Sequence, residues 1–526
     1  MNKLLPPPAR HWQTYDCDVL IAGAGFAGAL ASLVLHQQGL SVCLLEKGRH
    51  PRFAIGESST PVADLLLREL SRQYNLPWLH PLSRYGSWQE RYPEIVCGIK
   101  RGFSYFKHYP HREFVTDDGH SQELFVAASM SDQVSDTNWL RADFDTFLVE
   151  KVKEAGINYL DLAEITAARK DHRWSFQVFR RDAAEPGKYK IAASFFIDAS
   201  GGGALLETLL GVRSSARDFE TDSYAIFSHF DDIPPWSGML QRAHIPMHDY
   251  PYDPDHSALH QILEEGWVWM LRFNDRRTSL GFALDRGVLP PSGGQIQPRW
   301  DNLLNKYPSL GRLLDGVRLS AQPGRLIETD RLQRRADRCA GPGWAALPHT
   351  AGFVDPLFSS GIAQTLMGIQ RLCRILVRDW SDNIALACEL REYERAVFAE
   401  LRLIDCLVAG CYATMPYFAM FQAWSMLYFA ATITCEQRLL REGPGGYFLG
   451  ADNLAIWEMV KECNLALRQV LGNKSPGARA GARPGPSETE VLRFIALVRE
   501  KIAPFNKAGL MEPAARNMYR HTIAEL

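Results

Sequence analysis

The chain has 526 residues, more than the roughly 250–300 at which a single hydrophobic core stops growing, so we expect two or more lobes. Hydrophobic residues make up 46% and charged residues 22%, which is typical of a globular protein, and the formal net charge is -2. This near-neutral balance gives no reason to expect nucleic acid or an acidic membrane surface as a partner, and it favours small-molecule chemistry.

Residues 1–14 predict an N-terminal tail, because their proline run resists a helix and no apolar segment leads to a small-residue cleavage site. The ten cysteines include no C-x-x-C pair and no cysteine–histidine cluster at zinc spacing. We therefore expect a reduced, cytoplasmic protein without a metal site.

The strongest local pattern follows, where residues 17–48 read "CDVLIAGAGFAGALASLVLHQQGLSVCLLEKG". An apolar strand over 18–22 leads into Gly23, Gly25 and Gly28 in the G-x-G-x-x-G spacing, and a helix follows. The first glycine makes the tight turn, the second lets the backbone approach a pyrophosphate, and the third lets the helix sit against the strand. The positive end of the helix then receives the phosphates.

A second strand over 40–45 ends on Glu46, which lies 18 residues after Gly28. An acidic side chain at this position can accept hydrogen bonds from a ribose hydroxyl. Strand, helix, second strand and glutamate together predict a dinucleotide site.

The cofactor is predicted to be FAD, because the chain does not continue into further alternating βαβ units as a nicotinamide enzyme would. Antiparallel-looking strands follow instead, such as "HRWSFQVFRRD" at 172–182 and "KIAASFFIDASGGG" at 190–203. The second of these is expected to return to the first sheet with a glycine-rich end, which suits a long cofactor.

A second glycine signal occurs downstream, where apolar residues after Gly361 recur at a helical period. Ser359 or Ser360 can cap this helix, whose first N–H groups would face an anion. The anion could be the charged ring of a reduced flavin or a halide ion.

Residues 407–435 carry no formal charge and are long enough to raise the question of a membrane span. The stretch also contains Pro416, Gln422, Ser425 and many aromatic residues. We expect helices packed on the protein's own body rather than a membrane span.

Motifs along the chain occur in one order: the glycine turn with Glu46, then "GESSTP" at 56–61, "LRADFD" at 140–145, "DASG" at 198–201, "EEGWVWMLRF" at 264–273 and "AGFVDPLFSSGI" at 351–362. Together they resemble flavin-dependent halogenases over most of residues 15–400. Within that group, "CGIKRGFSYF" at 97–106 resembles the branch that acts on phenols and related electron-rich rings.

The expected fold class is α/β. A Rossmann-type FAD-binding module is interleaved with a mixed or antiparallel substrate sheet over residues 15–400, and a helical region over 401–526 covers the substrate pocket. The glycine, proline and alanine content of residues 473–488 predicts a flexible loop between helices.

The resemblance implies that reduced FAD and oxygen oxidise chloride or bromide to hypohalous acid, which travels to a lysine. Lys100 matches that lysine, which polarises the acid as a cation or is halogenated as a neutral amine. Ser360 and Gly361 match the halide-binding pair. Further positions expected at the cofactor are Ser58, Arg141, Asp355 and Ile362.

Each of these residues has a purely structural alternative. Lys100 and Arg141 can be surface cations, and Ser360 with Gly361 can be a helix cap and nothing more. The "GESSTP" segment can be a turn that starts a helix at Pro61, and Asp355 can be a buried turn carboxylate that caps backbone N–H groups.

Three departures from the family pattern carry information. Phe358 occupies the position at which tryptophan-specific members have a glutamate, so a phenol, which supplies its own electron push, is the expected substrate. Arg272 replaces the proline of the tryptophan motif, which leaves a flavin monooxygenase as an alternative function. Pro348 and His349 replace the usual Gly-Asp of related FAD enzymes, and His349 is interpreted as structural.

No second dinucleotide fingerprint occurs, so reduced FAD is expected from a separate NAD(P)H-dependent flavin reductase. The substrate is expected to be a small aromatic molecule, either free or tethered to a carrier protein. A noncatalytic FAD-binding protein is the third hypothesis.

Overall fold

The computed structural model describes residues 12–182, 184, 186–472 and 485–520. Strand β1 (Trp12–Ala22), helix α1 (Phe26–Gln37) and strand β2 (Val42–Leu45) form the predicted strand–helix–strand unit. Because β1 begins at Trp12, the last three residues of the expected tail 1–14 belong to the sheet, and the others lie outside the described residues.

The FAD-module sheet contains parallel strands in its centre, as the sequence predicts. β10 (Gly187–Asp198) pairs in parallel with β1, with Asp198 opposite Ala22. The strand order is β19-β20-β10-β1-β2-β7, and the hairpin of β8 and β9 joins along β10. The bounds of these strands are β7 Asn158–Leu160, β8 Ala163–Lys170, β9 Trp174–Arg180, β19 Ala340–Gly341 and β20 Trp344–Ala346.

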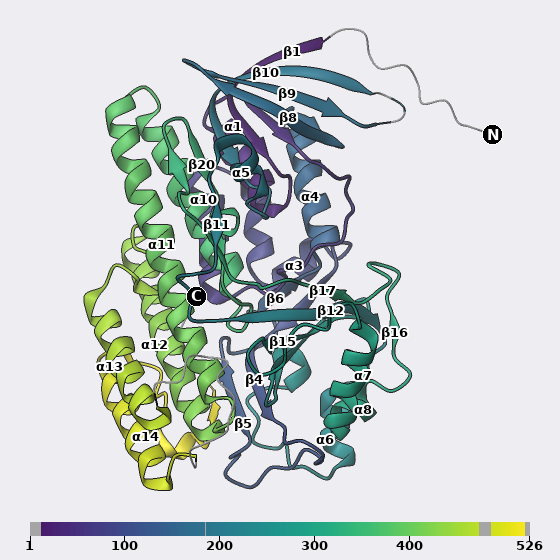
Figure 1. Cartoon of the computed structure of the whole chain (residues 1–526), viewed down its shortest axis with the longest axis vertical. Coiled ribbons are helices and arrows are strands. Elements are labelled where there is room, and N and C mark those ends of the chain that lie inside the picture. Colours follow the sequence, from purple (N-terminus) through teal and green to yellow (C-terminus); the bar gives the residue numbers. More distant parts are fainter. Residues whose placement is uncertain (1–11, 183, 185, 473–484, 521–526) are drawn as a thin grey trace, which may run out of the picture.

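The substrate sheet lies beside this module and is largely antiparallel (Figure 1). Its order is β16-β12-β15-β14-β13-β4-β5-β22, with β17 also on β12, and only the pairs β13·β4 and β22·β5 are parallel. The bounds are β4 Gly102–Lys107, β5 Glu123–Ala127, β12 Ser223–Asp231, β13 Ala258–Ile262, β14 Gly266–Arg272, β15 Arg277–Asp285, β16 Arg318–Leu319, β17 Ile327–Glu328 and β22 Met518–Tyr519.

Two small sheets connect the large ones. β3 (Cys97–Lys100) pairs with β6 (Asp136–Trp139), and β18 (Arg334–Ala336) pairs with both β11 (Ser214–Ser215) and β21 (Gly352–Phe353). The shorter helices are α2 Pro61–Gln73, α3 Tyr85–Arg91, α4 Arg141–Glu154, α5 Ala204–Leu210, α6 Trp236–Arg242, α7 Ile296–Lys306, α8 Pro308–Leu313 and α9 Pro348–Ala351.

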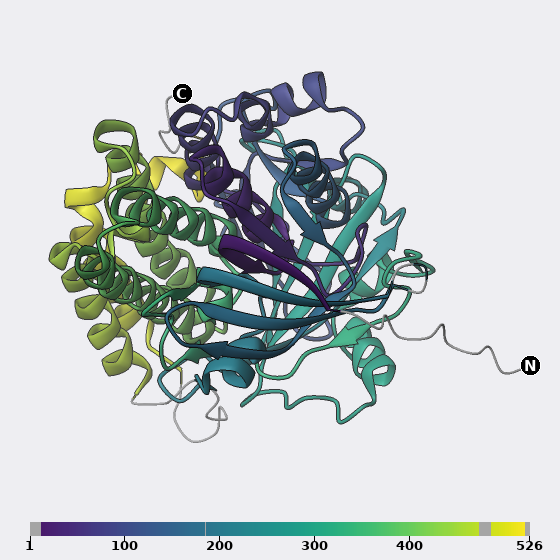
Figure 2. The ribbon, with the colours of Figure 1, turned by 90° about the horizontal axis from the view of Figure 1, so that it is seen from above.

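Long helices gather on one side of the sheets, which Figure 2 shows from above in green and yellow. They are α10 Ser360–Asp379, α11 Asn383–Thr414, α12 Phe418–Glu442, α13 Leu454–Leu471 and α14 Glu488–Ile502. The expected boundary at residue 400 falls inside α11, so the helical region is continuous with the FAD module. Residues 473–484 of the expected loop 473–488 lie outside the described residues.

Helix α12 is long and apolar enough to cross a membrane by length and composition, but 83% of its apolar window is buried inside the fold. Its uncharged surface packs on α11, α14 and α2. Helix α12 is therefore a core helix of the fold. The cytoplasmic location stays a prediction.

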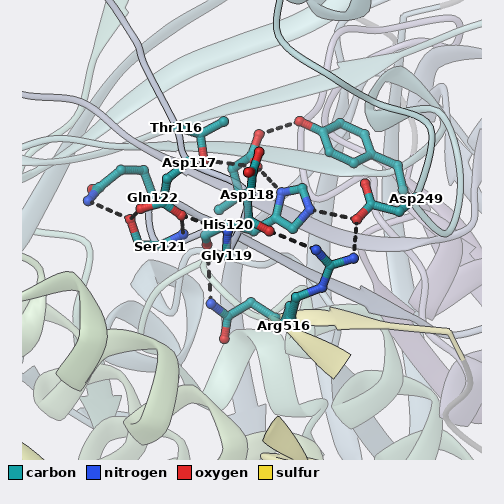
Figure 3. A network of polar contacts seen from close by, with 12 residues as sticks. Thr116, Asp117, Asp118, Gly119, His120, Ser121, Gln122, Asp249 and Arg516 are labelled. Carbon is teal, nitrogen blue, oxygen red and sulfur yellow. Dashed lines mark hydrogen bonds and ion pairs between the residues drawn. The ribbon is translucent and has the colours of Figure 1, made fainter. Parts of the chain in front are cut away.

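The chain end returns to the substrate sheet, so the C-terminal region is not purely helical. β22 pairs with β5, and Arg516 donates to Asp249 Oδ2 over 2.8 Å (Figure 3). His120 lies between Glu123 and Asp249, at 2.5 Å from a carboxylate oxygen of the first and 2.9 Å from one of the second. This network fastens the C-terminal strand to the hairpin loop between β4 and β5.

Candidate active site

A cavity of about 1040 Å³ opens between the FAD module and the substrate sheet. The glycine turn after β1 and the Ala199–Gly202 turn after β10 form one side of it. Trp267 and Trp269 of β14 form part of the opposite side. Among the sequence-predicted site residues, those on its wall are Gly23, Gly25, Glu46, Ser58, Arg141, Gly361 and Ile362.

The glycine turn is packed too tightly for side chains at two of its three glycines. Gly23 has a φ of 104°, and a Cβ there would lie 2.5 Å from the Ala199 oxygen. A Cβ on Gly28 would lie 1.9 Å from the Gly23 oxygen, so this glycine sets the packing of α1 on β1 and does not face the cavity. Gly25 is on the wall and faces Arg141.

Glu46 is buried at the end of β2, with its carboxylate oriented by the backbone. Oε2 accepts from the Ala24 N–H over 2.9 Å and Oε1 from the Gly48 N–H over 2.8 Å. Burial alone would raise its pKa, but Arg52 and these two N–H groups lower it overall. A fixed, charged acceptor at the cavity wall suits a ribose hydroxyl.

Arg141 begins α4 and is bound on both sides. Its Nε and Nη2 each donate to Asp145 over 2.9 Å, and Nη1 donates to the Ile55 and Gly56 oxygens. Asp145 also accepts from the Phe26 N–H at the start of α1 over 3.1 Å. Sequence reasoning missed Asp145, although its i,i+4 spacing from Arg141 in "LRADFD" is the signal for this pair.

The wall residues fit a bound FAD. Ser58 Oγ is buried and lacks a hydrogen-bond partner within the described part of the chain, which is costly unless a ligand supplies one. The cavity also suits a long cofactor in size and in its glycine-lined backbone. When bound there, FAD would contact the glycine turn, Glu46, Ser58 and Arg141.

Helix α10 begins at the cavity, as the second glycine signal predicts. Ser359 precedes the helix with a φ of 52°, and both Gly361 and Ile362 are on the wall. A Cβ on Gly361 would meet no atom within 4 Å, so open space lies before this turn. Ser360 is 5% exposed and lies beside the wall rather than on it.

Asp355 lies behind the wall. Its Oδ2 accepts from the Ser223 and Tyr412 hydroxyls over 2.8 and 2.9 Å, and Oδ1 accepts from the Leu357 N–H over 3.0 Å. Burial raises its pKa to about 6. This geometry favours the alternative in which Asp355 is a buried turn carboxylate.

Lys100 is fully buried at the end of β3, so it is not a solvated surface cation. Its Nζ donates to the Ser59 oxygen and lies 4.2 Å from the centroid of the Phe103 ring. Burial lowers its pKa to about 8, although the Asp136 and Asp64 carboxyls oppose the shift. At neutral pH both protonation states are within reach.

Two buried carboxyl groups surround Lys100, and neither was singled out from the sequence. Asp136 is the residue directly opposite Lys100 in the β3·β6 pair. Asp64 in α2 accepts from the Ser59 hydroxyl over 3.3 Å and shares a hydrogen bond with Asp136. Burial raises the pKa of both, to about 6 for Asp136.

The segment 56–61 links the cavity to the lysine. Gly56, Glu57 and Ser58 are on the cavity wall, the next carbonyl binds Lys100, and Thr60 with Pro61 lines a second, much smaller space. Six consecutive residues therefore run from the cofactor cavity past the buried lysine.

Arg272 points away from the cavity. It donates to Asp255 over 2.6 Å and to the Ile233 and Pro234 oxygens. Trp267, Trp269 and Leu271 remain on the wall. The loss of the family proline therefore does not remove the tryptophans from this site.

A glycine turn on a parallel sheet, with a long cavity continuing beneath a second sheet, defines an FAD-binding oxidoreductase. Residues 16–53 match the family model described as FAD binding domain, and residues 139–416 match the one described as Tryptophan halogenase. The second match covers more than half of the chain, so the chain belongs to this family of flavin-dependent halogenases.

Similar proteins are halogenases as well. The monodechloroaminopyrrolnitrin halogenase PrnC of Pseudomonas fluorescens is 27% identical over 510 residues, covering 90% of this chain and 85% of its own. The tetracycline 7-halogenase of Kitasatospora aureofaciens is 25% identical over 80% of this chain and 74% of its own. The crystal structure of halogenase PltM with phloroglucinol and FAD matches with a TM-score of 0.80 at 25% identity, covering 95% and 99% of the two chains.

Proposed function

We propose that this protein halogenates an electron-rich, phenol-like ring, and that Lys100 delivers the halogen as hypohalous acid. One observation carries the proposal: segment 56–61 touches the cofactor cavity at one end and binds the buried Lys100 through the Ser59 oxygen. An apolar residue could fill this buried position without the desolvation cost of a cation. Packing alone therefore does not explain a lysine here.

FAD, when bound in its reduced form, supplies with oxygen the oxidising power that converts chloride or bromide to hypohalous acid. The glycine turn, Glu46, Ser58 and Arg141 would hold the cofactor, since they border one cavity. The first turn of α10, with Ser360 and Gly361, binds the halide through backbone N–H groups at the positive end of a 20-residue helix.

Lys100 holds the hypohalous acid by donating a hydrogen bond to its oxygen. Its ammonium already donates to one carbonyl and faces an aromatic ring, which are contacts that suit the cation. The oxygen then leaves as water when the ring takes the halogen, and the Lys100 ammonium supplies the second proton of that water. The hydrogen-bonded pair of Asp136 and Asp64 lies next to the amine and partly offsets the lowering of its pKa by burial.

Phe358 and the similar proteins support this substrate class. Phe358 stacks on Tyr428 with ring centroids 4.0 Å apart, so no carboxylate is available at that position. An electron-rich ring such as a phenol donates electron density to the reacting carbon itself, so it depends less on a carboxylate at this position. Phloroglucinol, the molecule bound to PltM, is a phenol.

Reduced FAD is proposed to come from a separate NAD(P)H-dependent reductase, because the sequence has one dinucleotide fingerprint. The purified protein alone should then leave NADPH unoxidised. Whether a carrier protein presents the substrate can be tested by comparing free and carrier-bound rings in the same assay.

A hydroxylase on the same scaffold is the alternative, because Arg272 replaces the proline of the family's tryptophan motif. The outward direction of Arg272 and the retained tryptophans favour the halogenase instead.

The test is mass spectrometry of phenols, pyrroles and indoles incubated with the protein, a flavin reductase, FAD, NADH and chloride or bromide. A product with a halogen isotope pattern supports the proposal. A product heavier by one oxygen at any halide concentration would assign the protein to the hydroxylases, and bound flavin without any product would favour a noncatalytic role.

A further inference from the structure

A second space lies near Lys100, because the Phe103 ring that lines it also faces the Lys100 ammonium. It measures about 10 Å³, which is the scale of a single water. One wall is the face of α12 that carries Tyr428, Phe429, Thr432, Ile433 and Glu436, and these positions recur at a helical period. The opposite wall includes Thr60 and the Phe103 ring, whose face also contacts the Lys100 ammonium.

Glu436 is the unexplained group in this wall. It is 2% exposed, and its Oε2 has no hydrogen-bond partner among residues 12–472 and 485–520 that the structure describes. Thr60 Oγ1, on the other side of the same space, is buried and equally unpartnered within those ranges. Two residues that line one space and carry buried polar atoms without partners indicate that a water or a ligand supplies the missing hydrogen bonds.

Among the described residues, the groups that act directly on Glu436 are acidic or neutral. Asp136 of β6 acts on it through space, the Thr432 hydroxyl hydrogen-bonds it, and the Tyr428 hydroxyl of the same helix donates to the Phe358 oxygen over 2.9 Å. Burial, with a smaller contribution from Asp136, raises the pKa of Glu436 to about 8. No cation pairs with Glu436 in the described residues, so its carboxyl is not half of a structural ion pair.

We propose that Glu436 is the carboxyl group that receives a proton from the aromatic substrate during halogenation, and that it selects rings bearing an O–H or N–H donor. This inference rests on the proposed function, because it assumes that Lys100 delivers hypohalous acid beside this space. Glu436 thus supplies from α12 the acidic group that Phe358 does not supply from the loop before α10.

The proposed step balances with Lys100 as an ammonium and Glu436 as a carboxylate. The ring carbon bonds to the halogen as the halogen–oxygen bond breaks. The leaving hydroxide takes a proton from Lys100 and becomes water, while the ring loses a proton to Glu436. The ring is oxidised and the halogen reduced, and hypohalous acid is the oxidant that the proposed function already supplies.

A ring is far larger than the present space, so its entry requires side chains on α12 to move aside. Tyr428 and Phe429 are the large groups on that wall. The ring's donor would then reach Glu436 Oε2 and Thr60 Oγ1, the two atoms that lack partners within the described chain.

The first test is infrared spectroscopy of the whole protein without substrate. The carboxylic acid C=O band of the wild type should lose intensity as pH rises through about 8, and this loss should be absent from Glu436→Gln. The difference between wild type and variant isolates this group from Asp64 and Asp136. A spectrum in which Glu436→Gln removes no titrating band would overturn the protonation part of the proposal.

The second test measures halogenated product between pH 6 and 9.5 with a phenol, for the wild type, Glu436→Gln and Glu442→Gln. Glu442 lies on the same helix but is exposed and bonded to Arg438, so it controls for the amide substitution. We expect Glu436→Gln to lower the rate by at least about 10²-fold and to abolish its rise toward pH 8, with Glu442→Gln unchanged. Hypohalous acid trapped in solution should be equal in all three.

The outcomes separate this inference from the proposed function. Wild-type protein that forms no hypohalous acid would refute the proposed function. Wild-type halogenation that Glu436→Gln retains at the same rate and pH profile would refute the role of Glu436 alone. Loss of hypohalous acid in Glu436→Gln would also refute it, because the residue would then act at the cofactor cavity.

Discussion

The two spaces of the site differ in size and lining. The FAD cavity holds about 1040 Å³ and includes two glycine-rich turns in its wall, whereas the space near Lys100 holds about 10 Å³ and is lined mainly by aromatic and aliphatic side chains, with two threonines and Glu436. Buried charged side chains border both: Glu46, Glu57 and Arg141 border the first, and Glu436 borders the second. The difference suits the proposed division, in which halide oxidation takes place in the first space and halogen transfer at the second.

Lys100→Met is the substitution with the largest expected effect, and it tests this division directly. The substitution removes the only donor proposed to hold hypohalous acid, so halogenated product should fall by about 10²–10⁴-fold. FAD affinity should stay within about twofold, because Lys100 is not on the cavity wall. Mass spectrometry of the product and flavin fluorescence titration measure the two effects.

Lys107→Met is the matched control. Lys107 is also buried, has its pKa lowered to about 8 by burial, and donates to the Leu263 and Met415 oxygens. It borders neither space. If both variants lose halogenation equally at matched protein stability, the loss comes from removing a buried cation in general, and Lys100 has no special role.

The second prediction concerns pH. Burial lowers the pKa of Lys100 to about 8, so the ammonium that donates to hypohalous acid is depleted as pH rises above 8. The rate should fall about tenfold per pH unit above that value. A rate that keeps rising to pH 10 would show that the neutral amine reacts, as in a haloamine route.

Much of the fold could be predicted from the sequence, because the signals are local. The G-x-G-x-x-G spacing places Gly23, Gly25 and Gly28 in a turn whose packing admits little else. The return of the strand ending at Asp198 to β1 and the start of α10 before Gly361 also follow from short patterns. The parallel pairing of β22 with β5 did not follow, because it joins segments almost 400 residues apart through only two paired residues on each strand.

The site could be predicted only where a residue's neighbours lie within its own motif. Asp355 was expected at the cofactor, but its oxygens are used by Ser223 and Tyr412 from distant elements. Glu436 carried one sequence signal, as the first charge after the uncharged run 407–435. What it faces depends on tertiary packing against Thr60 and Phe103, which no local pattern encodes.

Two glycine substitutions, Gly28→Ala and Gly361→Ala, test how the glycines border the FAD cavity. Gly28→Ala should lower the free energy of unfolding by about 1–3 kcal/mol, because its Cβ would collide with the Gly23 oxygen. Gly361→Ala should raise it by about 0.5–1 kcal/mol, since alanine favours a helix and meets open space. Denaturant unfolding without cofactor measures both.

Gly361→Ala should nevertheless weaken halide binding, because the methyl group projects into the cavity before α10. We expect the chloride concentration for half-maximal product to rise about tenfold. An unchanged halide dependence would remove Gly361 from the proposed halide site while leaving the stability prediction intact.

The smallest expected effect lies outside both spaces, in the network of Figure 3. Burial alone would lower the pKa of His120, but the Asp249 and Glu123 carboxylates raise it above its ordinary 6.5. A raised folded-state pKa contributes stability that is complete below the unfolded value and is lost as pH rises through the folded value. The attachment of β22 should therefore weaken in alkaline solution.

Amide hydrogen exchange at Tyr519 should report this loss, with protection falling between pH 6 and pH 9 after correction for the intrinsic rate. His120→Gln should remove the pH dependence, since the glutamine side chain does not titrate. Arg516→Gln should lower protection by a similar amount at both pH values, because the guanidinium that it removes stays charged throughout this range.

Equal pH dependence in the wild type and His120→Gln would assign the effect to another group. The halogenation rates of His120→Gln and Arg516→Gln should equal that of the wild type, because the network borders neither space.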